Sequence, residues 1–156
     1  MRSDEVNTYK AFEEIDKELQ RTIKKSSEYD YIHLRNMFIG YMKTARQFNY
    51  YSAIDELVVD YAPEEGYNMD YLSERLKKLP ETKGFDAQFV TVPSAIKARR
   101  HNKFKPVDGI EIHIGNVTNM ERVIEAFRDT DRKQYLKIYC PDPYTFQCFY
   151  RKGEVE

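Results

Sequence analysis

The spacing of apolar residues changes near residue 84, and this change constrains the fold more than any other feature. Before it, apolar side chains recur every three or four positions, as on one face of an α-helix. After it, they alternate with polar residues, as in a β-strand with one buried face. A chain with helices in one half and strands in the other is typical of the α+β class. We therefore expect an α+β fold.

Four helices are predicted in the N-terminal half. They cover residues 4–25, 29–48, 52–62 and 68–79. Ser3, Ser52 and Asn68 are the expected N-caps, because their side-chain oxygens can accept a hydrogen bond from a free amide of the first turn. Gly40 lies in the middle of the second helix, where glycine lowers helix stability. We expect another element to approach the backbone at that point.

The C-terminal half predicts a small mixed sheet of β-α-β-β order on which the helical layer packs. The expected segments are strands over 85–92, 110–114, 134–140 and 144–150, with a helix over 118–127 that starts at the capping box of Thr118 and Glu121. A strand-helix-strand connection favours a right-handed parallel crossover. The last two strands form a hairpin that turns between Pro141 and Pro143. We divide the chain into a helical subdomain, residues 1–83, and an α/β subdomain, residues 84–156, and expect one cooperative unit.

Composition indicates a globular protein without a membrane segment. Leu, Ile, Val and Phe make up more than a fifth of the 156 residues, which is above the level typical of disordered chains. The longest apolar run, residues 37–42, is far too short to span a bilayer, and the N-terminus lacks a secretory signal. We expect a soluble, cytoplasmic protein.

Cysteine and histidine usage indicates neither a disulfide nor a metal site. Cys140 and Cys148 are expected to be small buried residues, held beyond disulfide reach by the predicted hairpin. The three histidines, at positions 33, 101 and 113, are scattered, and no metal-ligand spacing is present. We therefore expect no cofactor and no bound metal.

Residues 47–74 form an acidic stretch that contains no Lys or Arg. Seven Asp or Glu residues lie in it, with five tyrosines between them. Tyrosine offers a large contact area with few rotamers to freeze, and carboxylates complement a basic partner. We predict a protein-binding surface made of Asp55, Glu56, Asp60, Tyr61, Glu64, Glu65 and Tyr67. In the alternative, the rings pack between helices and the carboxylates are their solvated side.

Residues 97–105 form a basic segment in a chain whose net charge is −1. Its five cations are Lys97, Arg99, Arg100, Lys103 and Lys105. Such side chains can follow a phosphate backbone, and Phe104 could stack on a base. In the alternative, the segment is a solvated connection anchored by Ile96 and Phe104. Because residues 1–83 carry a net charge of −3 and residues 84–156 one of +2, we expect a molecule with two poles.

The outward face of the predicted sheet is a third candidate site. Glu111 and His113 alternate on one strand. Tyr135, Lys137 and Tyr139 alternate on another strand. If these strands are neighbours, the five side chains converge on one surface, where they could support acid-base chemistry or stack RNA bases. Helices cover such a face more often, and we assign no catalytic residue.

We interpret the chain as a non-enzymatic protein-binding module. It has no nucleophile motif and no glycine-rich phosphate loop. The leading hypothesis is a small inhibitor or regulator, of the kind encoded by phages and other mobile elements, that uses the acidic stretch against a basic partner. The alternative is a nucleic-acid-binding protein that uses the basic segment. An enzyme built around His113 is the third hypothesis.

Overall fold

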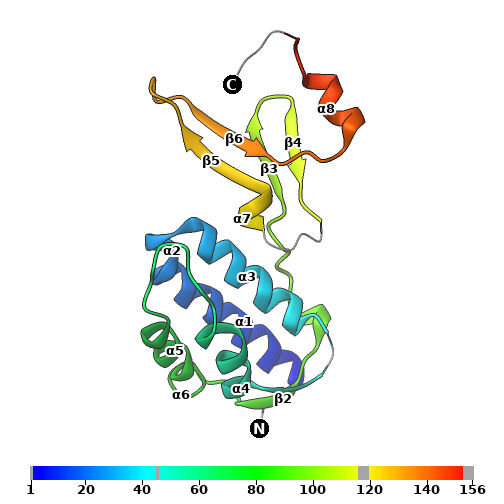
Figure 1. Ribbon diagram of the computed structural model, residues 1–156. Coiled ribbons are helices and arrows are strands. Elements are labelled where there is room, and N and C mark those ends of the chain that lie inside the picture. The colour runs from blue at the N-terminus through cyan, green and yellow to red at the C-terminus, as the bar shows by residue number, and fades with distance from the viewer. Residues whose placement is uncertain (1, 45, 116–119, 153–156) are drawn as a thin grey trace. The chain divides into compact units, whose positions relative to one another are not determined.

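The computed structural model describes residues 2–44, 46–115 and 120–152. It divides into a first unit, residues 1–101, and a second unit, residues 102–156. Helices dominate the first unit, and two-stranded ladders are the main feature of the second (Figure 1). The predicted α+β class with its helices N-terminal is confirmed. In the described part of the chain, no helix combines the length and the hydropathy that crossing a membrane requires.

The first unit begins with three helices, and its last element is a 3-10 helix. Its elements are α1 (Asp4–Arg21), α2 (Ile23–Ser26), α3 (Glu28–Met42), β1 (Gln47–Asn49), α4 (Tyr50–Ile54), the π-helix η1 (Asp55–Val59), α5 (Met69–Lys77), α6 (Leu79–Lys83), β2 (Gln88–Val90) and the 3-10 helix η2 (Pro93–Ala95). Two predicted caps are confirmed, since Ser3 Oγ accepts from the Val6 amide and Asn68 Oδ1 from the Tyr71 amide. The Ser52 cap is wrong: α4 begins earlier and is capped by the side chain of the preceding Asn49.

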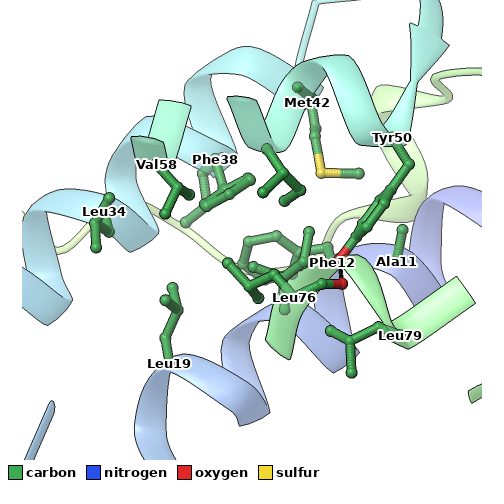
Figure 2. Packing of buried hydrophobic residues seen from close by; sticks show 14 of the residues in the cluster. Ala11, Phe12, Leu19, Leu34, Phe38, Met42, Tyr50, Val58, Leu76 and Leu79 are labelled. Carbon is green, nitrogen blue, oxygen red and sulfur yellow. Dashed lines mark hydrogen bonds between the residues drawn. The ribbon is translucent and has the colours of Figure 1, made fainter. Parts of the chain in front are cut away.

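The core of the first unit is built where α1 and α3 pack along each other and α5 packs against α1. Its largest fully buried side chains include Phe38, Phe48, Tyr50, Leu72 and Leu76. Figure 2 shows Tyr50 reaching across this core, where its hydroxyl donates a hydrogen bond of 2.6 Å to the Leu76 carbonyl. One phenol thus joins α4 to α5 inside the core.

A short antiparallel ladder between β1 and β2 closes the first unit. Phe48 pairs with Phe89, and their ring centroids are 4.9 Å apart. The predicted second helix is therefore too long, because its last residues form β1, and the predicted strand over 85–92 is shorter than expected. Residues 84–101 pack within the first unit, whereas the subdomain boundary predicted from the sequence follows residue 83. Folding of the whole chain as one cooperative unit stays a prediction.

The second unit contains two antiparallel hairpins and two short helices. Its elements are β3 (Lys103–Val107), β4 (Ile110–His113), α7 (Met120–Val123), β5 (Ile124–Arg128), β6 (Gln134–Ile138) and α8 (Pro143–Phe149). β3 pairs with β4, and β5 pairs with β6. The finer expectation of one mixed sheet with a parallel crossover is corrected, because the described strands form three separate two-stranded antiparallel sheets.

Two segments of the second unit adopt a different structure from the expected one. The predicted helix over 118–127 gives way to β5 from residue 124, because that segment pairs in register with β6; Thr118 of its capping box lies outside the described residues. The predicted strand over 144–150 is the helix α8. Asp142 caps it by accepting a hydrogen bond from the Thr145 amide at 2.9 Å, and proline at the first position suits a helix start.

The environment of the two cysteines differs from the expectation. Both thiols are free, as predicted, but Cys148 on α8 is exposed and Cys140 is half-buried. The expected burial of Cys148 is therefore wrong. It depended on a strand pairing that α8 replaces.

Candidate functional site

The acidic stretch runs through β1, α4, η1, the loop over residues 60–68 and the start of α5. The five carboxylates predicted to bind a partner are all exposed: Asp55, Glu56, Asp60, Glu64 and Glu65. The two predicted tyrosines, Tyr61 and Tyr67, are half-buried. The rings thus pack in part against the first unit while the carboxylates face solvent.

Contacts with α3 give the acidic stretch its direction. The Tyr61 hydroxyl donates to Asp30 Oδ1 near the start of α3 at 2.7 Å, and the Tyr41 hydroxyl near its end donates to Glu56 Oε2 at 3.2 Å. At a rise of about 1.5 Å per residue, these contacts lie about 16 Å apart along the helix. The segment therefore runs back along α3. We call four of its exposed carboxylates the acidic strip: Glu56, Asp60, Glu64 and Glu65.

The two ends of the acidic strip carry different charge environments. Near Glu56, the Arg46 guanidinium lies over the Tyr41 ring, 4.1 Å from its centroid. Asp55 points away from the strip and pairs with Lys77 on α5, as expected for neighbours on a helix. Within the described residues, no ion pair engages the carboxylates at the other end, which are Asp60, Glu64 and Glu65. The uncompensated negative charge is therefore concentrated there.

Asp30 is a fully buried carboxylate that fixes the loop of the acidic strip. It lies in the first turn of α3, where the helix dipole stabilises negative charge, and its amide donates to Ser27 Oγ at 3.1 Å. Its oxygens accept from the Tyr61 hydroxyl at 2.7 Å and from the amides of Glu64 at 3.1 Å and Glu65 at 3.4 Å. A carboxylate withdrawn from water needs such donors. We call this set of hydrogen bonds the Asp30 clamp.

The Tyr61 hydroxyl stays protonated in the Asp30 clamp. Burial, followed by the hydrogen bond to Asp30, raises the pKa of Tyr61 well above its usual range. Sequence reasoning missed Asp30, although an acidic residue three positions after Ser27 fits a helix start. That signal is local, whereas the loop that Asp30 holds lies more than thirty residues further along the chain.

Residues 99–101 of the basic segment are held against α3 through their backbone. Arg35 Nη1 donates to the carbonyl oxygen of Arg99 at 3.0 Å. Asn36 exchanges two hydrogen bonds with the backbone of His101, at 2.9 and 3.3 Å. Because these bonds use main-chain atoms, residues 99–101 keep a fixed path without using the charged ends of Arg99 and its neighbours.

The boundary between the units divides the basic segment. The Arg100 guanidinium lies where a Cβ on Gly40 would stand, which confirms the expected approach of another element to this glycine. The first unit carries Lys97, Arg99 and Arg100, and β3 of the second unit carries Lys103 and Lys105. The five cations therefore belong to two units, and only the first three share one.

The expected convergence of side chains on an outward sheet face is wrong. Glu111 and His113 lie on β4, which pairs with β3. Tyr135 and Lys137 lie on β6, which pairs with β5, and Tyr139 directly follows β6. The five side chains belong to two separate ladders. β4 and β6 therefore do not pair into the single sheet face on which acid-base chemistry around His113 would depend.

An open pocket of about 340 Å³ lies on the first unit, and sequence reasoning missed it. Its lining residues are Asp16, Gln20, Tyr31, Ile32, Arg35 and His101. The Tyr31 hydroxyl donates to Asp16 Oδ1 at 2.7 Å, and Arg35 Nε lies 3.4 Å from the same oxygen. Burial, together with the hydrogen bond to Asp16, raises the pKa of Tyr31 to about 12. These three groups satisfy one another, so the Tyr31 hydroxyl does not release its proton near neutral pH.

Neither a search for metal-binding clusters in the described part of the chain nor comparison with known proteins identifies a functional site. Among the residues that the structure describes, no group of three or more His, Cys, Asp or Glu side chains is arranged to hold a metal ion. Comparisons with models of protein families, with curated proteins and with solved structures find no match. In the acidic strip, a buried carboxylate fixes the backbone of Glu64 and Glu65, and their side chains carry uncompensated negative charge.

Proposed function

We propose that the protein works by binding another protein, with its acidic strip against a basic surface of that partner. The observation that carries this proposal is the Asp30 clamp. It fixes the backbone of Glu64 and Glu65 through their amides and leaves both side chains in solvent. By covering a basic surface on its partner, the protein would act as a small inhibitor or regulator.

Physical chemistry favours a preorganised acidic loop as a binding element. A loop that is already ordered loses less conformational entropy when it binds, so more of the interaction energy appears as affinity. Uncompensated carboxylates steer a basic partner and raise the association rate, especially at low salt. The half-buried rings of Tyr61 and Tyr67 add rigid contact area next to the charges.

A charge-reversal experiment tests this proposal. Wild-type protein and the triple variant Asp60→Lys, Glu64→Lys, Glu65→Lys are used to capture proteins from a lysate of the source organism. A matched control reverses three exposed carboxylates that are not part of the strip, with Glu5→Lys, Glu81→Lys and Glu111→Lys. Both variants change the net charge equally, and circular dichroism checks that each remains folded.

The expected result is a set of basic proteins that the wild type and the control capture and the triple variant loses. Their capture should weaken as salt is raised, because surface charges are screened. If the triple variant captures the same proteins as the wild type, the acidic strip is not the binding surface.

Nucleic-acid binding is a second candidate function, supported by the fixed backbone of residues 99–101. Arg99 and Arg100 are exposed on this backbone, and the exposed Lys97 lies two residues before it in the first unit. Fluorescence anisotropy with single- and double-stranded DNA and RNA, at low and moderate salt, tests it. Binding that weakens steeply with salt, and weakens further when these three residues become alanine, would support it. Absence of salt-sensitive binding would remove it.

A further inference from the structure

The second unit exposes apolar side chains that a stable fold normally covers. None of its residues over 102–115 and 122–152 is buried, whereas the first unit has a continuous core. Its exposed large apolar residues are Val107, Ile110, Phe127, Tyr135, Leu136, Ile138, Tyr139, Tyr144, Phe146, Phe149 and Tyr150. Isolated two-stranded hairpins are marginally stable in water, and units of this size bury little surface by themselves. A further surface that covers these side chains would therefore stabilise the second unit.

One face of the β5–β6 hairpin combines aromatic rings with a pair of opposite charges. In the antiparallel register, Glu125 lies opposite Lys137, and Phe127 lies opposite Tyr135. The two rings stack with centroids 5.3 Å apart and an interplanar angle of 20°. Tyr139 extends the same face, because side chains alternate along β6. Phe127, Tyr135 and Tyr139 are 48%, 45% and 60% exposed. We call these five residues the aromatic face.

We propose that the aromatic face docks on the aromatic face of a second copy of this chain. Consider a two-fold axis that lies above this face, parallel to the strands and over the line midway between β5 and β6. This axis places Glu125 of one copy against Lys137 of the other, and Phe127 of one copy against Tyr135 of the other. Such isologous contacts repeat every interaction twice. The face is thus complementary to itself in charge and places ring against ring.

The charge of the second unit favours a second copy over a strongly charged partner. Residues 102–156 contain nine Lys or Arg and nine Asp or Glu, so two copies meet without net repulsion. A surface made for nucleic acid or for a highly charged protein would carry an excess of one sign. Low net charge next to exposed apolar side chains promotes self-association.

Sedimentation velocity of the full chain tests this proposal with complementary charge variants. The wild type is expected to form a dimer. Glu125→Lys and Lys137→Glu should each be monomeric, because two faces of one sign then meet. Mixed in equal amounts, the two variants should form a heterodimer, because the charges are again opposite across the interface. Asp131→Lys, in the exposed turn between β5 and β6, makes the same charge change off the face and should stay dimeric.

The mixing step separates docking from effects within one hairpin. Glu125 and Lys137 also face each other within one chain, and loss of that pair could weaken a hairpin but would not be repaired by adding another chain. A further variant, Tyr139→Ala, removes an aromatic ring one residue after the last paired residue of β6. It should weaken dimerisation about tenfold. A monomeric wild type, a dimer unaffected by the charge variants and by Tyr139→Ala, or a mixture that stays monomeric would overturn the proposal. A complex with a different protein on this face, in place of the dimer, would also overturn it.

Discussion

At the residue scale, Asp30 determines more of the acidic strip than any exposed side chain does. It is a fully buried charge, and its hydrogen bonds to Tyr61, Glu64 and Glu65 tie it to the loop of the strip. A carboxylate only accepts hydrogen bonds, so three donors can converge on it without conflict. The buried carboxylate of Asp30 therefore positions the backbone that carries the exposed carboxylates of Glu64 and Glu65.

Replacing Asp30 with asparagine should loosen this loop. An amide keeps one acceptor oxygen but turns an NH₂ group toward a backbone donor, which leaves buried groups unsatisfied. We expect Asp30→Asn to lower the free energy of unfolding in urea by about 1–3 kcal/mol and to speed hydrogen exchange at the amides of Glu64 and Glu65. Asp60→Asn, at an exposed position, is the control and should change stability by less than about 0.5 kcal/mol. A stable Asp30→Asn variant with slow exchange at both amides would contradict the clamp.

The buried Tyr50 hydroxyl should make the protein less stable in alkali. Burial raises the pKa of Tyr50 well above its usual range, so the folded state keeps the phenol neutral while the unfolded chain ionises it near pH 10. The stabilisation is complete below about pH 10 and is lost as the pH rises above that value, by up to about 1.4 kcal/mol per pH unit. Tyr50→Phe should have a shallower alkaline slope in urea unfolding. Equal slopes for the two proteins would contradict this assignment.

At the scale of elements, α3 supports both charged segments. Its first turn holds the acidic loop through Asp30, and its middle holds the basic segment through Arg35 and Asn36. Near its C-terminal end, Tyr41 contacts η1 through Glu56. A change within α3 should therefore affect either charged segment without touching its charges.

Gly40 and Arg100 should be coupled in stability. Alanine in a helix interior is favoured over glycine by about 1 kcal/mol, but a Cβ at Gly40 would displace the Arg100 guanidinium. We expect Gly40→Ala to stabilise an Arg100→Ala background more than the wild type, by about 0.5 kcal/mol or more. Arg99→Ala serves as the control background, where the effect of Gly40→Ala should equal that in the wild type. Additive effects in all backgrounds would show that Arg100 does not rest on this glycine.

Helix starts at Ser3 and Asn68 could be predicted from neighbouring residues, whereas the strands depend on pairing between residues far apart in the sequence. Ser3 and Asn68 act through amides within one helical turn, so their roles could be read from the sequence. Phe48 continues a helical stripe, yet it belongs to a strand because Phe89, far along the chain, pairs with it. The cap at Asp142 was a local signal that the alternation of the following residues obscured. For the acidic strip, the sequence identified the displayed charges but not the clamp.

At the scale of the whole molecule, the two units differ in core and in charge. The first unit has a continuous hydrophobic core and a net charge of −1. The second has no buried residue over 102–115 and 122–152 and a net charge of zero. The sequence predicts a negative N-terminal half and a positive C-terminal half. The two units do not carry such opposite net charges, because three cations of the basic segment belong to the first unit. If the second unit dimerises, each dimer presents two acidic strips, which would strengthen binding to a partner with two basic sites.

The first unit should fold without the second. A fragment of residues 1–101 retains every member of the core cluster, so we expect a cooperative urea transition for this fragment alone. Circular dichroism measures the transition, and the urea concentration at its midpoint should lie close to that of the full chain. A fragment without a cooperative transition would show that the first unit depends on the second, in line with the expectation of one cooperative unit.

Carboxyl footprinting of the complex tests the proposed binding surface most directly. The protein is labelled at its carboxylates with a water-soluble carbodiimide, free and bound to a partner captured as above, and the sites are quantified by mass spectrometry. We predict that labelling falls at Asp60, Glu64 and Glu65 in the complex, while Asp129 and Asp131 in the second unit are labelled equally in both states. Unchanged labelling at the three strip carboxylates in a saturated complex would contradict the account.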